Sequence, residues 1–203
     1  MATIAIIDYG VGNLRSIRNG FERVGAKVRI TNHEGELRAA DALVLPGVGS
    51  FRDAMKNLAP LSRVVLDETD SGKPLLGICL GFQLLFTSST EEGTYRGLDV
   101  FKGKVVRLPS GLKVPHIGWN TLKIVRPDNS LFHDVHDHTY VYFNHSYYAN
   151  PQSESDVVTT TEYGISFASS VARGCVFATQ FHPEKSGADG LRILRNFTHL
   201  VKR

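Results

Sequence analysis

The sequence predicts an α/β fold: a single domain over residues 1–203 with a mostly parallel central sheet, flanking helices and added antiparallel strands. In the first half of the chain, short apolar runs alternate with segments of helical period, a pattern typical of right-handed β-α-β crossovers. After about residue 98, strand-like runs follow one another at short spacing, which indicates antiparallel structure. A length of 203 residues suits one such domain.

The parallel core is predicted from four apolar runs bounded by turn residues, at 3–7, 27–30, 42–45 and 75–79. In an open α/β sheet the carboxyl ends of parallel strands meet at one edge, where such proteins place their active sites. The residues that directly follow these strands are therefore the first candidates for function.

Helices are predicted where apolar residues recur every three or four positions. Asn13 is placed to cap a helix that buries Ile17 and Phe21 and stops at Gly25. The same spacing predicts further helices at 51–58, from 61 onward, at 80–85 and at 191–201. The second half contributes seven predicted strands, at 105–108, 114–117, 122–125, 140–143, 157–161, 165–168 and 176–179.

Composition and charge exclude several classes of protein. Hydrophobic residues make up 42% of the chain and charged residues 21%, as in ordinary globular domains. The net charge of +3 is spread along the chain, which argues against a nucleic-acid-binding surface. We expect no membrane span and no secretory signal, because no run of 18 apolar residues occurs and the N-terminus lacks a basic region. Two cysteines fit a reducing compartment, so we expect a cytoplasmic protein.

The strongest local signal for chemistry is Cys79, at the end of the predicted strand 75–79. Gly77 and Gly81 stand two positions to either side of it, as in a nucleophile elbow with cysteine in place of serine. The following helix would aim free N–H groups at the thiol, which lowers its pKa and offers a donor to an oxyanion. The alternative is a small, buried apolar side chain, the usual role of a free cysteine.

A thiolate nucleophile needs a base, and among eight histidines His182 is the best placed. It closes the apolar strand 176–181, and Glu184 follows two residues later across a proline that stiffens the turn. Glu184 can then hold the imidazole in one tautomer. By itself this motif could be a turn with a solvated carboxylate. The chain order of cysteine, histidine and glutamate differs from that of α/β-hydrolases, in which the acid precedes the histidine.

A third segment, Pro46-Gly47-Val48-Gly49, directly follows the strand predicted at 42–45. Its glycines allow backbone N–H groups to face a ligand and allow a peptide plane to turn over at low cost. The alternative is an ordinary turn. A phosphate-binding loop is disfavoured because no Gly-Lys-Ser/Thr follows.

Together these segments resemble the class I, or triad, glutamine amidotransferases, whose fold has a flavodoxin-like core. Within that family, the sequence resembles the glutaminase subunits of imidazole glycerol phosphate synthase, an enzyme of histidine biosynthesis. Six segments carry the resemblance, in the family's order along the chain: 8–14, 46–51, 77–81, 115–120, 143–147 and 180–186.

The resemblance implies a role for each matching residue. Cys79 would form a γ-glutamyl thioester with glutamine, His182 would transfer protons and Glu184 would orient His182. The N–H groups of Leu80 and Val48 would form the oxyanion hole, the latter after the Gly47–Val48 peptide turns over. We expect that peptide to face the wrong way at rest. The resemblance also implies glutamine contacts at Gly49, Gln83, Glu91, His145, Ser146 and Tyr147.

The resemblance further implies a partner, a (β/α)8 barrel cyclase that consumes the ammonia and forms a heterodimer with this chain. Asn13, Trp119, Asn120, Tyr142 and Lys185 would lie at or near that interface. No cofactor and no metal is implied.

Two other functions fit the same residues. A self-sufficient thiol hydrolase or peptidase would use Cys79 and His182, and would be active as an isolated chain. A binding or regulatory module would use the segment 133–138, rich in His and Asp, as a metal site, although such a segment is more often a polar surface loop. Cys175 lacks flanking glycines and is predicted to pack in the core. His116 and His145 could each be structural.

Overall fold

In a computed structural model that describes residues 2–201, the main sheet has eight strands in the order β2-β1-β3-β4-β14-β13-β12-β9. Five neighbouring strands are parallel: β2 (Lys27–Thr31), β1 (Thr3–Ile7), β3 (Ala42–Leu45), β4 (Leu75–Ile78) and β14 (Val176–Thr179). The other three continue the sheet in antiparallel fashion: β13 (Ser166–Arg173), β12 (Val157–Glu162) and β9 (Lys123–Ile124).

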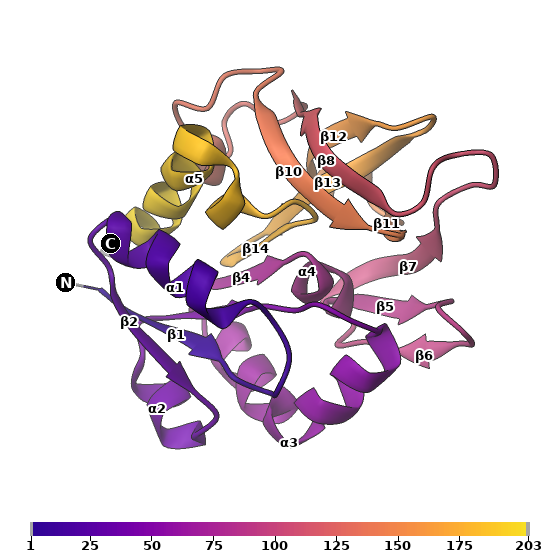
Figure 1. Cartoon of the computed structure of the whole chain (residues 1–203). Helices are drawn as coiled ribbons and strands as arrows, with labels where there is room; N and C mark the ends of the chain where they lie inside the picture. The colour runs from indigo at the N-terminus through magenta and orange to yellow at the C-terminus, as the bar shows by residue number, and fades with distance from the viewer. Residues whose placement is uncertain (1, 202–203) are drawn as a thin grey trace.

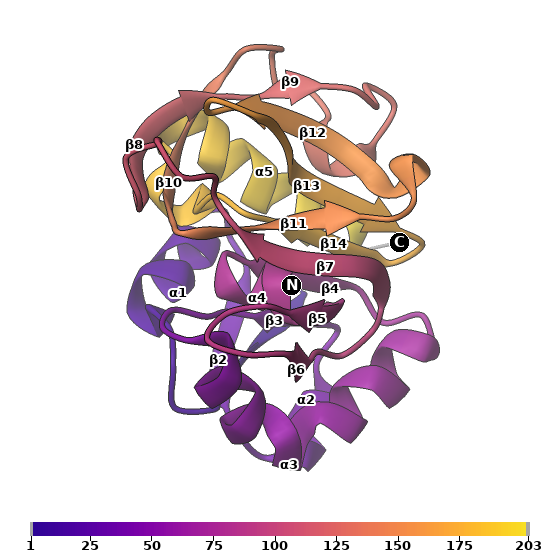
Figure 2. The ribbon, with the colours of Figure 1, turned by 90° about the vertical axis from the view of Figure 1, so that its right-hand side faces the viewer.

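Two smaller sheets extend the molecule beyond this core. One is the antiparallel pair of β8 (His116–Thr121) and β10 (Tyr140–His145). The other has the order β11-β7-β5-β6, and Figure 2 shows its strands one above another. Its strands are β5 (Phe86–Ser89), β6 (Tyr95–Arg96), β7 (Phe101–Arg107) and β11 (Tyr147–Pro151).

Helices cover both faces of the main sheet (Figure 1). The helices α1 (Leu14–Arg23) and α5 (Gly187–Leu200) lie on one face, and α2 (Glu34–Ala39) and α3 (Phe51–Asp70) on the other. The short α4 (Leu80–Leu84) follows β4 directly. Single 3-10 turns, named η1 to η3, span Ser130–Phe132, Glu154–Asp156 and Pro183–Lys185. No helix within residues 2–201 is long and apolar enough to cross a membrane.

Alternation along the buried strands produces two apolar cores, one on each side of the sheet. In β1, Ile4 and Ile6 belong to the core beneath α1 and α5, together with Phe21. Ala5 and Ile7 point the other way, into the core shared with α2 and α3. Because successive side chains of a strand point to opposite faces, a fully apolar run is the expected sequence of a strand covered on both sides.

The structure confirms the α/β class and the four parallel strands predicted in the first half. Asn13 caps α1 by accepting a hydrogen bond from the Ser16 N–H, and Gly25 follows the helix with φ of +83°. Left-handed backbone of that kind is typical of a glycine that ends a helix.

The prediction of two helices over residues 51–65 was wrong, because α3 runs unbroken from Phe51 to Asp70. Pro60 lies inside it on the exposed side, where water can solvate the carbonyl that proline leaves without a partner. The apolar stripe of Phe51, Leu58, Leu61 and Val65 keeps its spacing across the proline, so burial of that stripe holds the helix together.

Other predicted bounds were also shifted. The strand predicted at 114–117 begins instead at His116, after Pro115, which cannot donate a ladder hydrogen bond. Four elements were not predicted: α2, β5, β6 and β11. They are short or weakly patterned. The strands β5 and β11 both pair with β7, and β6 pairs with its neighbour in the chain, β5.

Candidate active site

The loops that follow four parallel strands meet at one edge of the main sheet. Tyr9 lies after β1, the Pro46–Gly49 segment after β3, Cys79 after β4 and His182 after β14. Residues more than 100 positions apart in the sequence, such as Cys79 and Gln180, thus contact each other, with Gln180 Nε2 lying 3.9 Å from the Cys79 sulfur. This edge is where parallel α/β sheets place their chemistry.

Cys79 occupies a strained turn between β4 and α4. Its φ of +56° and ψ of −107° are unusual for a residue with a side chain. The flanking glycines permit the turn: a Cβ on Gly81 would lie 1.9 Å from the Leu45 carbonyl oxygen, and one on Gly77 would lie 2.9 Å from the Gly81 carbonyl oxygen. Backbone therefore passes close on both sides of Cys79, as a nucleophile elbow requires.

The imidazole of His182 is buried between a carboxylate and the thiol. Its Nδ1 lies 2.8 Å from Glu184 Oε1, and the two side chains are 3% and 0% exposed. Burial lowers the pKa of His182, but the charges of Cys79 and Glu184 outweigh this and raise the pKa to about 10. No hydrogen bond of standard geometry joins Nε2 to the sulfur, although Cys79 lies close enough to influence the pKa of the ring. The arrangement favours the protonated, imidazolium form of His182 beside the Cys79 sulfur.

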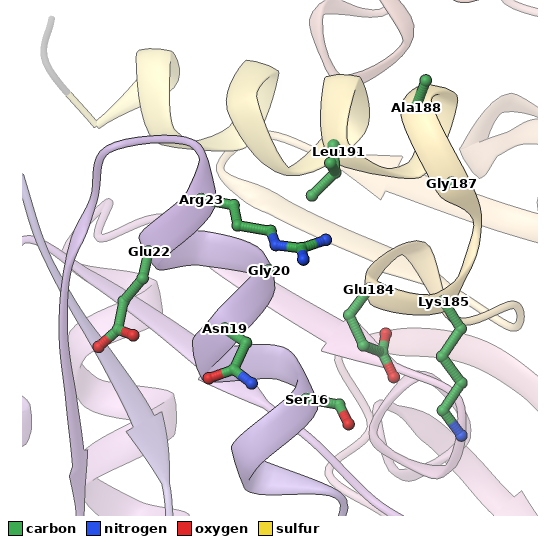
Figure 3. A pocket seen from close by; sticks show the side chains of 10 residues that line it. All are labelled: Ser16, Asn19, Gly20, Glu22, Arg23, Glu184, Lys185, Gly187, Ala188 and Leu191. Atoms are coloured by element: carbon green, nitrogen blue, oxygen red, sulfur yellow. The ribbon is translucent and has the colours of Figure 1, made fainter.

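Two residues that sequence analysis did not single out position His182 and Glu184. The Ser186 hydroxyl donates to the His182 carbonyl oxygen at 2.6 Å and accepts from the Tyr142 N–H at 3.0 Å, which ties the turn after β14 to β10. Gly20 in α1 lies against Glu184, and a Cβ at Gly20 would be 3.3 Å from Glu184 Cβ (Figure 3). Ser186 adjoins the predicted His182 motif, but a contact with Gly20 has no signal in the sequence.

The segment predicted to form half of the oxyanion hole faces the site with its carbonyl. The Leu80 N–H donates to the Gly47 carbonyl oxygen at 3.4 Å. Because the C=O and N–H of a trans peptide point in opposite directions, the Val48 N–H points away from Leu80. Neither of the two predicted donors is therefore free for a substrate oxyanion in this conformation, which is the orientation expected for the resting state.

A cavity of about 230 Å³ opens beside Cys79. Its lining includes all six residues to which the resemblance assigned glutamine contacts, together with both oxyanion residues and Cys79. Pro115 and Asn144, which sequence analysis did not assign to the site, line it as well, and the Asn144 carbonyl oxygen lies 3.7 Å from the Cys79 sulfur. Free glutamine is small enough for such a cavity, whereas a folded substrate protein is not.

Hydrogen bonds fix the walls of this cavity. The amide nitrogen of Gln83 donates to the Tyr147 carbonyl oxygen at 2.8 Å. Glu91 Oε2 accepts from the Phe51 N–H at 2.7 Å, at the start of α3. This hydrogen bond holds the Glu91 carboxyl group at the N-terminus of α3, at the edge of the cavity.

His145 belongs to a directional chain of hydrogen bonds that runs behind the cavity. Its Nδ1 donates to the Tyr147 carbonyl oxygen at 2.9 Å, so its Nε2 accepts from His116 Nδ1, also at 2.9 Å. The Asn120 amide lies 3.3 Å from the other nitrogen of His116. Burial lowers the pKa of His145 to about 3 and that of His116 to about 4, so both rings are neutral. Both are thus buried structural histidines, and His145 also lines the cavity.

The predicted interface residues come from four elements: Trp119 and Asn120 from β8, Tyr142 from β10, Lys185 from η3, and Asn13 from the start of α1. The Trp119 ring, 55% exposed, lies 6.2 Å from the ring of Tyr142, and the Lys185 ammonium is 5.7 Å from that ring on another side. Asn13 caps α1, and Asn120 donates to the Glu162 carbonyl oxygen. Trp119, Tyr142 and Lys185 thus form one cluster, while Asn120 is engaged within the chain.

The segment 133–138 does not gather its side chains around a point. His133 pairs with Asp134 and His138 with Asp137, all of them on the exposed surface. Across residues 2–201, no group of three or more His, Cys, Asp or Glu side chains is arranged to hold a metal ion. Cys175 packs at the rim of the core beneath α3, with its sulfur 3.4 Å from the Thr69 carbonyl oxygen.

Comparison with known proteins identifies the family. Residues 5–201 match the model of the class-I glutamine amidotransferases. Solved structures share the fold: PurLQS from Thermotoga maritima has a TM-score of 0.79 at 19% identity, over 98% of this chain and 99% of that one. A second structure, described as a glutamine amidotransferase, has a TM-score of 0.77 at 20% identity, with the same coverage.

Sequence relatives narrow the family further. The HisH subunit of imidazole glycerol phosphate synthase from Moorella thermoacetica is 50% identical, over 100% of this chain and 97% of that protein. The HisH subunit from Geobacter metallireducens is 52% identical, over 97% of this chain and 98% of that protein. The chain therefore belongs to the class-I glutamine amidotransferases and, among them, to the HisH subunits of imidazole glycerol phosphate synthase.

Proposed function

We propose that Cys79, His182 and Glu184 hydrolyse L-glutamine and that the ammonia passes to a (β/α)8 barrel cyclase subunit. The barrel would use it to form imidazole glycerol phosphate and AICAR in the cytoplasm. The observation that carries this proposal is the position of Cys79, on a strained turn beside His182, at the edge of a cavity sized for a free amino acid. The chain itself is a glutaminase subunit of histidine biosynthesis.

The reaction would proceed in two stages. The Cys79 thiolate attacks the side-chain amide carbon, and the C–N bond breaks as imidazolium His182 protonates the departing nitrogen, which releases ammonia. Neutral His182 then takes a proton from water, whose oxygen attacks the thioester. The C–S bond breaks, glutamate leaves, and Cys79 is again a thiolate beside imidazolium His182. Glu184 holds the imidazole in one orientation throughout.

Charge and position favour glutamine over a peptide. A free glutamine carries an α-ammonium group, and Glu91 provides a carboxylate in the cavity lining to receive it. Gln83, His145, Ser146 and Tyr147 line the same cavity and would contact the remainder of the amino acid. A peptide substrate lacks the free ammonium and would leave Glu91 without its counter-charge.

Full activity would require the Gly47–Val48 peptide to rotate. Rotation removes the Gly47 carbonyl from the Leu80 N–H and turns the Val48 N–H toward the site, which completes the oxyanion hole. A missing oxyanion donor costs ~10²–10³ in rate, so the resting orientation would keep ammonia from being released without an acceptor.

The partner would dock on the surface formed by Trp119, Tyr142 and Lys185. Exposed aromatic side chains beside a cation are typical of interface anchors. Tyr142 also connects this surface to the site, because its N–H binds the Ser186 hydroxyl that contacts His182.

The test is glutamine hydrolysis by the chain alone, with the barrel subunit, and with the barrel subunit plus its ribonucleotide. We expect weak activity alone and a large rise in the loaded complex. Cys79→Ala should abolish glutamine use while the complex still reacts with added ammonium salts, and Cys175→Ala should retain both reactions. Rapid cleavage of peptides or esters by the isolated chain, with no action on glutamine, would instead support a thiol hydrolase.

A further inference from the structure

Tyr9 is a buried polar side chain to which the proposed mechanism gives no role. It follows β1, is 6% exposed, and its hydroxyl donates a hydrogen bond to the Pro46 carbonyl oxygen. Burial raises the pKa of Tyr9, and the charge of Cys79 raises it further, so the hydroxyl stays protonated and remains a donor. Tyr9 is thus a permanent link between the turn after β1 and the oxyanion segment.

The turn after β1 touches the oxyanion segment at a second point. A Cβ on Gly12 would lie 3.2 Å from Pro46 Cβ, so the backbone of the turn packs directly on the proline ring. Gly47 is equally confined: a Cβ there would lie 2.8 Å from the Tyr9 hydroxyl oxygen and 2.7 Å from Leu80 Cβ. A displacement of the turn would therefore disturb its contacts with Pro46 and Gly47.

The same turn leads to the predicted partner surface. Gly10 is exposed, and Val11 to Asn13 are partly exposed, before α1 begins at Leu14. Tyr9 lies at the buried end of this segment, against Pro46 and close to Cys79. A partner that contacts Asn13 would therefore press on a segment whose other end holds the oxyanion loop.

We propose that Tyr9 is a positioning residue that holds the Pro46–Gly47 peptide, and thereby keeps the Gly47 carbonyl on the Leu80 N–H until the partner displaces the turn. This inference rests on the proposed function, since it concerns how the same site is kept inactive. Loss of the tether should make rotation of the Gly47–Val48 peptide easier, without altering the cavity walls that bind glutamine.

Tyr9→Phe tests the tether because it removes the hydroxyl and keeps the ring. A net hydrogen bond of ordinary strength corresponds to about a 2- to 10-fold change in an equilibrium, so we expect kcat for glutamine hydrolysis by the isolated chain to rise by that factor. KM should be unchanged, and the rate of the fully loaded complex should stay within about twofold, so the activation ratio falls by a similar factor. Tyr163→Phe is the matched control, since its hydroxyl donates to the Lys113 carbonyl oxygen at 2.7 Å outside the site.

Hydrogen exchange of the Leu80 amide provides a second readout that does not depend on turnover. The Gly47 carbonyl protects this amide at rest, so exchange should be faster in Tyr9→Phe than in the wild type, while amides of β1 and β4 exchange as before. If the variant were generally less well folded, exchange of the β1 and β4 amides would also be faster, and that result would contradict a specific role of the Tyr9 hydroxyl.

An unchanged or lower basal kcat in a folded Tyr9→Phe chain would overturn the proposal, as would loss of the stimulated rate. Neither result would affect the proposed function, which is judged on the wild type. If the wild-type complex itself fails to hydrolyse glutamine, the proposed function fails whatever Tyr9 does.

Discussion

The Gly47 carbonyl oxygen accepts a hydrogen bond from the Leu80 N–H at 3.4 Å. One carbonyl thus occupies a donor that a substrate oxyanion would need, and its own peptide turns the Val48 N–H away. Cys79, His182 and Glu184 lie at the same edge of the sheet. Under the proposed mechanism, the step that would remain before catalysis is a local rotation of one peptide plane.

Val48→Gly should raise the glutaminase rate of the isolated chain. Rotating the Gly47–Val48 peptide by half a turn changes φ of Val48 by about 180°, and φ of Val48 is negative here, so rotation brings a β-branched residue to positive φ. Glycine would remove a cost of ~1–2 kcal/mol, which corresponds to a rise of roughly 5- to 30-fold. Steady-state assays of glutamine hydrolysis by the isolated chain, without the partner, measure this rise in rate.

Val125→Gly is the control for this substitution, because Val125 is similarly exposed, at 44% against 41% for Val48. Its basal rate should match the wild type. A Val48→Gly chain whose basal rate is no higher than that of the wild type would mean that φ of Val48 does not limit the rotation.

Glu184→Gln should lower kcat for glutamine by ~10²–10⁴-fold, because an amide can donate to His182 Nδ1 and so favour the wrong tautomer. The carboxylate helps to raise the pKa of His182, so the alkaline limb of the pH–rate profile should also move to lower pH. The fall in kcat and the shift of the alkaline limb are both measured from the pH dependence of glutamine hydrolysis by the loaded complex. The ammonia-dependent reaction is the internal control and should not change. A variant with wild-type kcat and profile would remove Glu184 from the triad.

Gly20→Ala should reduce both stability and kcat. The added Cβ would lie 2.7 Å from Leu194 Cδ1 and 3.3 Å from Glu184 Cβ, so the buried Leu194 side chain or α1 itself must move, and Glu184 must give way with it. Overpacking of this kind costs ~1–3 kcal/mol in the free energy of unfolding.

Gly35→Ala is the matched control, since nothing lies within 4 Å of a Cβ at Gly35 in α2. It should be neutral or stabilising by ~0.5–1 kcal/mol. Urea unfolding measures the stability of the two variants, and glutaminase assays measure their kcat. If Gly20→Ala and Gly35→Ala have the same stability and the same kcat, α1 does not position Glu184.

Stability should fall on acidification below pH 6.5, because burial lowers the pKa values of His116 and His145 to about 4 and about 3. In the unfolded chain both histidines bind a proton near pH 6.5, whereas in the folded chain His116 does so only near pH 4 and His145 only near pH 3. Protonation therefore favours the unfolded chain, and the stability present above pH 6.5 is lost as the pH falls. The expected loss is on the order of 1 kcal/mol per histidine per pH unit.

Urea titrations between about pH 4.5 and 7.5 measure this slope. His116→Gln and His145→Gln should each flatten it, and His33→Gln, on the exposed surface, should not. A double variant of the buried pair with the wild-type slope would show that these rings do not carry the effect.

The proximity of Cys79, His182 and Glu184 could be predicted because its signals are local. Glycines at fixed spacing from Cys79 and a strand that ends just before His182 are visible in the sequence, and the parallel core dictates that their loops meet. The cavity residues could be listed by resemblance alone, since neither composition nor period marks Gln83 or Glu91.

The remaining features depend on contacts between distant segments. His116 and His145 are unremarkable in sequence until β8 pairs with β10, which puts the two directly opposite in register. Gly20 and Tyr9 are positioned by packing against Glu184 and Pro46, and no local pattern encodes either contact. The continuity of α3 is also not a local signal: it contains Pro60, and proline breaks helices on average, but burial of one apolar stripe outweighs that tendency here.

The central claim, that Cys79 is the nucleophile of a glutamine site, is tested most directly by covalent labelling. A glutamine analogue with a chloromethyl ketone in place of the amide would alkylate the attacking thiolate, with loss of chloride. Peptide mapping should find the adduct on Cys79, suppressed by excess glutamine and absent in Cys79→Ala. An adduct on Cys175 instead, or one on Cys79 that glutamine does not suppress, would contradict the account.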